Sequence, residues 1–375
     1  LNQAREEHAN LGNAFDVAQI DNNIGLTFFY TGNWENARST WRDAADQFKR
    51  LGEWREDLNA RQNQAVIDGL QGYNAKAIET LTYINDSLPA GKEPQFRVTV
   101  LDNLAENHRL FGNYDDALQT FSTARDIHRQ IGDKIGEAYS LRGIGNTYFS
   151  FGELDLATRY LQQARPLAEQ ANDGRSLEAI LARLGDISFL HTDYSSALEL
   201  HRAALEITAA DPDRAHRMLL VAKDLAAMNM HEEALALAIQ ARDLAESSDS
   251  LVTIADALIR IGRSNVALKS PSAEAFETAL GIYETLGLKI GQADAYNGLA
   301  ISAHNLGHLD ESLRYGQASI ANVESLRGQV AIPELRALYS AASRGYYETQ
   351  IELLMSGHAE SAPTSDRYLY DALAT

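Results

Sequence analysis

The sequence contains no cysteine, which excludes disulfide bonds, thiolate metal ligands and a cysteine nucleophile within its 375 residues. Basic side chains are few: 33 Lys and Arg stand against 52 Asp and Glu, and the formal net charge is −19. Such an excess of negative charge disfavours nucleic acids and anionic membranes as partners. No stretch approaches the roughly 20 apolar residues of a transmembrane helix. Hydrophobic residues still make up 45% of the chain, too many for a disordered acidic chain.

Motifs of known chemistry are also missing from the sequence. It has no P-loop, no dinucleotide-binding fingerprint, no His-Glu-x-x-His and no Gly-x-Ser-x-Gly. His304 and His308 have the spacing of a helical metal-binding pair, but Gly307 between them is expected to end the helix. We therefore predict no catalytic residue, no metal site and no cofactor. A cytoplasmic location is favoured, although a longer parent protein could be exported.

The chain repeats itself with a period of about 40 residues. One series of small residues recurs in the middle of a helical pattern, and a second series recurs twelve positions later, at the start of the next helical pattern. Both series continue along the chain and define eight repeats. The fourth repeat is the clearest, with predicted helices at 135–151 and 154–170 on either side of Gly152. The first five members of the two series are Gly25, Ala65, Ala105, Gly145 and Gly185, and Ala37, Ala77, Ala117, Ala157 and Ala197.

This pattern of small residues, large residues and turn glycines resembles the tetratricopeptide repeat (TPR). The resemblance implies an all-α fold, a right-handed superhelix of about eight ~40-residue helix hairpins. HEAT-like repeats share the period but lack the combination of glycine, turn and alanine. Asp68, Lys223 and Asp224 depart from the pattern because they occupy positions expected to be apolar. The motif residues are Ile144, Gly145, Tyr148, Gly152, Ala157, Leu161 and Ala164 in repeat four, and Ile24, Gly25, Phe28, Gly32, Ala37, Trp41 and Ala44 in repeat one.

The repeats suggest three segments. Residues 4–8 align with residues 124–128, so we expect residues 1–11 to be the tail of a truncated preceding repeat. Residues 12–322 would form the eight-repeat array. Residues 323–375 would form a helical extension, with a long helix at 338–355, that leads to a domain beyond Thr375.

The extension resembles the segment that joins TPRs to the caspase-like peptidase domain of bacterial CHAT proteins. The matching residues are Glu324-Ser325-Leu326-Arg327, Tyr346-Tyr347-Glu348 and Leu353-Leu354-Met355. The resemblance implies that this chain is a non-catalytic scaffold which senses a partner and regulates an attached protease. That downstream protease domain would be its intramolecular partner.

A binding groove is expected on the concave face of a TPR superhelix, which is lined by the first helix of each pair. Asn and Arg at such positions can hydrogen-bond an extended peptide or its carboxylate, although they can also be solvated or bonded within the superhelix. A protein or peptide is therefore the predicted partner. The candidate groove residues are Asn22, Phe29, Asp102, Glu106, Arg109, Arg142, Asn146, Phe149, Asp186 and Phe189.

Two other functions fit the same pattern. The array could be the sensor of a nucleotide-dependent signalling ATPase or transcriptional regulator, or it could be a receptor for a peptide pheromone. The domains encoded on either side of this chain would distinguish these possibilities.

Overall fold

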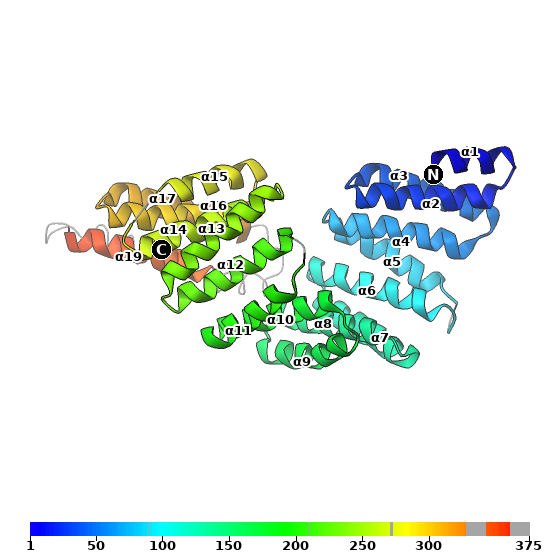
Figure 1. Ribbon diagram of the computed structural model, residues 1–375, viewed down its shortest axis with the longest axis horizontal. Helices are drawn as coiled ribbons and strands as arrows, with labels where there is room; N and C mark the ends of the chain where they lie inside the picture. The colour runs from blue at the N-terminus through cyan, green and yellow to red at the C-terminus, as the bar shows by residue number, and fades with distance from the viewer. Residues whose placement is uncertain (90, 210, 271–272, 328–342, 361–375) are drawn as a thin grey trace. The chain divides into compact units, whose positions relative to one another are not determined.

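The computed structural model describes residues 1–89, 91–209, 211–270, 273–327 and 343–360 (Figure 1). Every regular element in these ranges is an α-helix, and they contain no strand. This confirms the prediction of an all-α fold. No helix in the described ranges is long and apolar enough to cross a membrane. The helices group into two compact units, Leu1–Asp173 and Gly174–Thr375, a division that the repeat pattern did not predict.

The first unit contains a short helix and four helical hairpins. The short helix, α1 (Asn2–Asn10), packs against the helix that follows it. The hairpins are α2 (Ala14–Tyr30) with α3 (Trp34–Leu51), α4 (Trp54–Leu70) with α5 (Asn74–Ser87), α6 (Pro94–Phe111) with α7 (Tyr114–Ile131), and α8 (Lys134–Ser150) with α9 (Leu154–Gln170).

In its described residues the second unit contains four more hairpins and one further helix, α19 (Arg344–Glu360). Together the two units hold the eight hairpins that the sequence predicts. The hairpins of the second unit are α10 (Gly174–Leu190) with α11 (Tyr194–Ile207), α12 (Asp211–Ala227) with α13 (His231–Ser247), α14 (Leu251–Ala267) with α15 (Glu274–Leu286), and α16 (Lys289–Asn305) with α17 (Leu309–Arg327).

Packing in both units is sequential, as in a solenoid. In each unit a helix packs against the next one along the chain, and first helices of successive hairpins also meet, as α12 meets α14 and α14 meets α16. Helix α19 packs against α17 and α16, so it takes the place that the first helix of another hairpin would occupy. The right-handed sense of the whole array stays a prediction.

Glycine forms the turn in five of the hairpins, as the sequence predicts, whereas the turns of α10–α11, α12–α13 and α14–α15 have Thr192, Asn229 and Lys269 in a left-handed conformation. Gly152, between α8 and α9, has φ +83°, a left-handed conformation that L side chains adopt only at a cost. Gly307 has φ +79° and follows the end of α16 at Asn305, so His304 and His308 do not share a helix. The predicted helices at 135–151 and 154–170 are confirmed within one residue.

A glycine on one helix and a large side chain on the other determine how hairpins close. A Cβ at Gly25 would lie 2.5 Å from Nε1 of Trp41, and one at Gly145 would lie 2.8 Å from Cγ of Leu161. Both large side chains are at most 2% exposed. The recurring small residues in the sequence therefore leave the space into which these large side chains fit.

The C-terminal helix differs from the prediction. Helix α19 begins at Arg344 and ends at Glu360, whereas the sequence suggested a helix at 338–355. Ser343 lies in a turn, and its carbonyl oxygen accepts the N–H of Tyr346 at 3.1 Å. Residues 338–342 and 361–375 lie outside the described residues.

Candidate binding face on the first helices

The predicted groove residues of α2 are engaged within their own hairpin. The ring of Phe29 lies 5.9 Å from that of Trp41 and 5.6 Å from that of Tyr30, measured between centroids. Asn22 is partly buried: its backbone carbonyl oxygen accepts the Trp41 indole N–H at 2.9 Å, whereas its side-chain Oδ1 is buried without a hydrogen-bond partner among the described residues. Phe29 therefore contributes to packing more than to an open surface.

Asp102 on α6 is not the exposed groove residue that its position suggested. It is 9% exposed, and its carboxylate accepts from Nε2 of His128 at 2.9 Å and from the hydroxyl of Ser140 at 2.8 Å. The other ring nitrogen of His128 lies 2.8 Å from Asp133. Burial acts to lower the pKa of His128, but the two carboxylates outweigh it and raise the pKa. This network ties α6, α7 and α8 together.

The remaining candidates of the first unit are partly buried. Arg109 pairs with Glu106 on the same helix at 2.5 Å. The guanidinium of Arg142 lies over the ring of Tyr139, 4.9 Å from its centroid. Asn146 and Phe149 follow on α8 and also have partners. Most polar groups that were predicted to face a ligand in this unit are bonded to the protein itself.

Asp186 and Phe189 on α10 belong to the second unit. Asp186 accepts from Arg183 at 3.1 Å, and the ring of Phe189 lies 3.6 Å beneath Nζ of Lys223 on α12. The cation–π contact brings together a predicted groove residue and one of the residues that broke the repeat pattern. The predicted face thus continues from α10 to α12.

A buried ion pair that the sequence analysis missed lies directly behind this face. His201 on α11 and Asp224 on α12 have side chains that are 0% exposed, and Nδ1 of His201 is 2.5 Å from the carboxylate. Nε2 is 3.1 Å from the carbonyl oxygen of Ala182, which can only accept. Both ring nitrogens must therefore donate, and His201 is the charged imidazolium.

The position of His201 in the repeat was the available signal. It occurs 40 residues after Leu161, at the place of the large side chain that fills the hairpin, and a Cβ at Gly185 would lie 2.5 Å from its ring. A titratable residue at a packing position, next to an Asp at another apolar position, indicates a buried pair. Asp68 in repeat two is explained in the same way, because it pairs with Arg38 at 2.6 Å.

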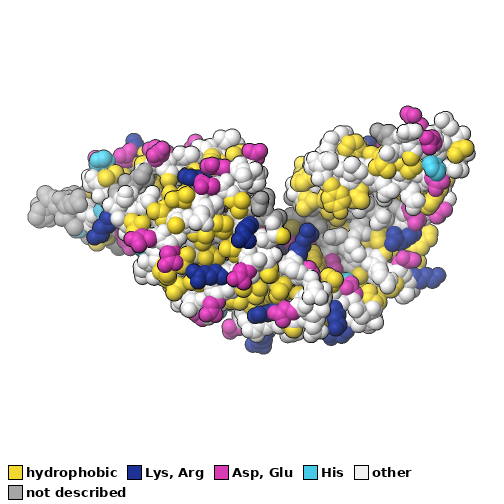
Figure 2. Space-filling model, in the orientation of Figure 1, with side chains coloured by type: hydrophobic (Ala, Val, Ile, Leu, Met, Phe, Trp, Pro, Cys, Tyr) yellow, Lys and Arg dark blue, Asp and Glu magenta, His cyan; other side chains and the backbone are white. Residues whose placement is uncertain are grey.

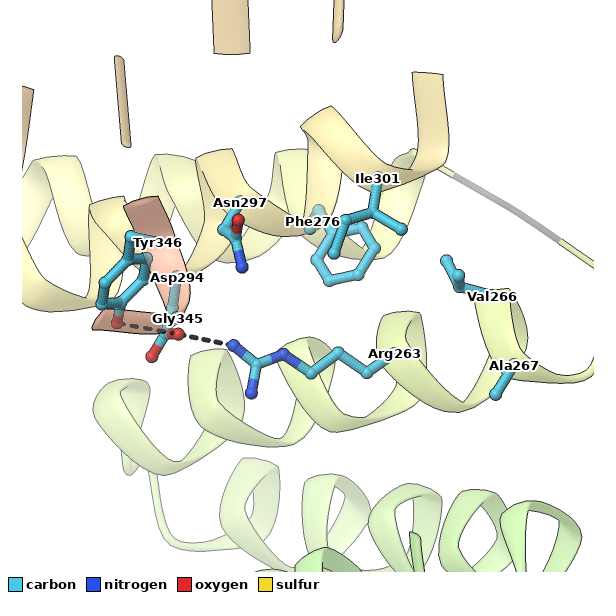
Figure 3. Close-up of a pocket in the computed structure, with 10 residues that line it drawn as sticks. Arg263, Val266, Ala267, Phe276, Asp294, Asn297, Ile301, Gly345 and Tyr346 are labelled. Atoms are coloured by element: carbon cyan, nitrogen blue, oxygen red, sulfur yellow. Dashed lines mark hydrogen bonds and ion pairs between the residues drawn. The ribbon is translucent and has the colours of Figure 1, made fainter. Parts of the chain in front are cut away.

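A cavity of about 510 Å³ lies between α14, α16 and α19 (Figure 3). Its polar end holds Arg263, Asp294 and Tyr346: one oxygen of Asp294 accepts from the guanidinium at 2.5 Å and from the tyrosine hydroxyl at 3.1 Å. Asn297 lies between this cluster and the apolar end. Val266, Ala267, Phe276 and Ile301 form the apolar end.

A smaller cavity of about 130 Å³ adjoins the first and shares Asp294 with it. Arg260 of α14 lines it together with Asp256 and Tyr283, whose hydroxyl donates to Asp256 at 2.5 Å. Within the described ranges Arg260 forms no ion pair. Figure 2 shows apolar and charged side chains interspersed on the visible surface of this unit.

The cavity residues follow the same offsets from the repeat glycine as the predicted groove residues. Asn146 and Phe149 come one and four positions after Gly145, and Arg142 comes three before it. The same offsets, counted from the equivalent positions 222, 262 and 300, give Lys223, Arg263, Val266, Asn297 and Ile301. These offsets therefore reach four residues that line the large cavity, Arg263, Val266, Asn297 and Ile301, but they do not reach Asp294, Phe276 or Tyr346.

Nothing in the described ranges is arranged as a metal site, because no three His, Asp or Glu side chains come together to hold an ion. Arginine, aspartate and asparagine around an apolar cavity can bind and orient a ligand through hydrogen bonds and charge. The predicted lack of a cofactor stays a prediction.

Residues 96–170 match the tetratricopeptide repeat family. No curated protein sequence matches the chain significantly. Among solved structures, the apo form of the quorum sensor NprR from B. thuringiensis has a TM-score of 0.65 and 14% sequence identity, over 86% of this chain and 93% of that one.

Two further structures share the fold. The STAND protein PH0952 from Pyrococcus horikoshii, a signal transduction ATPase with a tetratricopeptide repeat sensor, has a TM-score of 0.62 and 15% identity, over 87% of this chain and 50% of that one. The Rap conjugation gene regulator of plasmid pLS20, in complex with the Phr* peptide, has a TM-score of 0.56 and 17% identity, over 74% and 77%. The match and the hairpins together show that residues 96–170 form a tetratricopeptide repeat region within an all-helical repeat fold.

Proposed function

We propose that this chain is a non-catalytic scaffold that binds a protein or peptide segment along the first helices of its second unit. The observation that carries the proposal is the pair of adjoining cavities lined by α14 and α16, with charged groups at one end and apolar side chains at the other. A linear segment presents backbone amides and alternating side chains, which such a surface can bind. The partner is neither nucleic acid nor membrane in this proposal.

The finer proposal is that binding regulates a caspase-like CHAT protease attached after this chain. Its support is the resemblance of the tail together with the position of α19, whose Tyr346 hydrogen-bonds Asp294 of α16 beside the cavity. Tyr347 hydrogen-bonds Glu324 of α17, so both tyrosines hold α19 on the last hairpin. A ligand in the cavity would touch the helix that leads toward the protease.

A peptide receptor is the second candidate. The likeness to the quorum sensor NprR and to a Rap regulator in complex with a peptide favours it over the sensor of a signalling ATPase. Both candidates use the same binding face, and they differ in what is attached to the chain.

A peptide-display selection tests the binding function. Random dodecapeptides displayed on phage are selected against the chain, and enriched peptides are then measured by fluorescence anisotropy. We expect binding that protects α12, α14 and α16 from amide hydrogen exchange. Arg314→Gln is the matched control, because Arg314 is an arginine of the same unit whose side chain is 71% exposed on α17. Absence of any enriched peptide would refute the scaffold role.

The regulatory proposal needs the parent protein. If the gene encodes a caspase-like domain after Thr375, its peptidase activity is measured with and without an enriched peptide. We expect the peptide to change the peptidase activity, and we expect Asn297→Ala to abolish this change. A nucleotide-binding domain on either side, or activity that ignores a bound peptide, would contradict the regulation of a protease.

A further inference from the structure

Three cations lie on α12 and α14, two helices that pack against each other, although the chain as a whole carries a net charge of −19. They are Lys223, Arg260 and Arg263. Among the described residues only Arg263 forms an ion pair, with Asp294 at 2.5 Å. Burial, together with the positive charge of the neighbouring arginines, lowers the pKa of Lys223 and of Arg260.

The carboxylates near these cations already have other partners. Asp186 accepts from Arg183, Asp224 from His201, and Asp256 from the hydroxyl of Tyr283. Asp294 is shared by Arg263 and Tyr346. Lys223 and Arg260 are therefore left without a direct counter-charge among the described residues, in a partly buried place where an anion would be favoured.

Arg260 lines the small cavity and Arg263 lines the large one. Arg260 and Arg263 are three positions apart on α14, so they lie on one side of the helix, and Asp294 lines both cavities. The apolar end of the large cavity, formed by Val266, Phe276 and Ile301, lies beyond them. The volume of the large cavity, about 510 Å³, is within the usual ~300–1,000 Å³ of a ligand pocket. It is large enough for a bulky apolar side chain.

Asn297 adds a group suited to a peptide backbone. It projects into the cavity between the polar and apolar ends, and its Oδ1 is buried without a hydrogen-bond partner in the described structure. A side-chain amide can accept from a backbone N–H and donate to a backbone carbonyl at the same time. This geometry favours a peptide over a free organic anion.

We propose that the site recognises a peptide segment that carries a side-chain carboxylate next to a bulky apolar side chain. The carboxylate binds Lys223 and Arg260, the apolar side chain fills the cavity between α14, α16 and α19, and Asn297 bonds the backbone between them. The inference rests on the proposed scaffold function and names the class of ligand for it.

The test uses the complete chain and synthetic peptides that are acetylated at the N-terminus and amidated at the C-terminus, so that only side chains are acidic. Each peptide of seven residues carries one glutamate and one phenylalanine, at separations of one to four positions. Fluorescence anisotropy is expected to show binding for at least one separation. Replacing the glutamate by glutamine, or the phenylalanine by alanine, should weaken that binding at least tenfold.

Variants of the chain locate the contacts. The double variant Lys223→Gln with Arg260→Gln should weaken binding of the glutamate peptide at least tenfold and leave binding of the glutamine peptide unchanged, because the lost interaction needs both charges. Ile301→Trp should abolish binding by filling the cavity, and Arg314→Gln should change nothing. Circular dichroism and thermal unfolding check that each variant is folded, and the charge variants remain decisive if Ile301→Trp does not fold.

The outcomes separate the two proposals. If phage selection enriches peptides without an acidic and apolar pair, or if binding requires a free C-terminal carboxylate, the ligand class is wrong and the scaffold function stands. If the glutamate peptide binds both the charge variant and the unchanged chain equally well, the assigned cations are wrong. If no peptide is enriched or binds, the scaffold function itself fails.

Discussion

At the scale of single residues, the hairpins depend on pairs of one glycine and one large side chain. Gly25 on α2 leaves room for Trp41 on α3, and Gly262 on α14 leaves room for Phe276 on α15. A Cβ at Gly262 would lie 2.6 Å from Cζ of Phe276. Each pair concentrates the packing of its hairpin at one point, so a single methyl group is enough to disturb it.

Gly25→Ala tests this packing. The added Cβ would overlap the indole of Trp41, which is 2% exposed, so we expect a loss of about 1–3 kcal/mol in unfolding free energy. Urea unfolding measures the change. Gly281→Ala in α15 is the control, since its Cβ would meet nothing within 4 Å and should instead gain about 0.5–1 kcal/mol. Equal effects at both positions would contradict the packing argument.

His201 provides a test by pH. Burial acts to lower its pKa, but Asp186 and Asp224 outweigh burial and raise the pKa to about 9, above the model-peptide value of 6.5. The stabilisation is therefore complete below pH 6.5 and is lost as the pH rises toward 9. Urea midpoints of the unchanged chain and of His201→Gln should differ most near pH 6 and converge toward pH 9.5. Parallel curves across this range would show that the imidazolium contributes nothing.

At the scale of helices, most of the fold could be predicted from local sequence. The ends of α8 and α9 followed from Gly152 and from helical periodicity, because these signals act within a few residues. The start of α19 did not follow, because Ser343 forms a turn that no local signal marked. For the candidate site, the sequence predicted a binding face on the first helices of the hairpins but did not name the cavity residues. The offsets that define the predicted groove remain a prediction, and in the first unit Asp102 is bonded to His128 from another helix, which periodicity cannot reveal.

Helix α19 gives the prediction at this scale. Replacing Tyr346 and Tyr347 by Phe removes the hydroxyls that donate to Asp294 and Glu324 and leaves the rings in place. We expect amide hydrogen exchange in α19 to become at least fivefold faster, because its two hydrogen bonds to the last hairpin are lost, each worth about 1 kcal/mol or more. Thr349→Val on the same helix removes a hydroxyl that bonds only the carbonyl of Gly345 and should leave the rest of α19 unchanged.

If the double variant exchanges at the unchanged rate, the two hydroxyls contribute nothing and other contacts of α19 hold it on the hairpin. Gly316 on α17 shows how close the two helices are, because a Cβ there would meet the amide of Gln350 and the side chain of Leu353 on α19.

At the scale of the whole molecule, sequential packing means that stability is a sum of neighbouring terms. The two units, Leu1–Asp173 and Gly174–Thr375, each have their own hairpins and their own buried residues. Destabilisation of one hairpin should therefore remain local. Neither the number of units nor the surplus of cations on α12 and α14 could be predicted from composition, because the net charge averages over all surfaces.

Hydrogen exchange with mass spectrometry checks this locality. Gly25→Ala should accelerate exchange in α1 to α4 and leave α12 to α17 unchanged, because the altered hairpin packs against α1 and α4. Gly262→Ala is the reciprocal variant, and it should accelerate exchange in α14, α15 and the helices that pack against them, α12, α13 and α16. A uniform acceleration in either variant would mean that the chain unfolds as one cooperative body.

The shared oxygen of Asp294 has a consequence for signalling. It accepts from Arg263 of α14 and from Tyr346 of α19, so one carboxylate oxygen joins these two helices. A ligand that fills the adjacent cavity would contact α14, α16 and α19 at once and add its own contacts to this joint. Occupancy of the site would then be reported as a tighter grip on the C-terminal helix, without any movement of the hairpins beneath it.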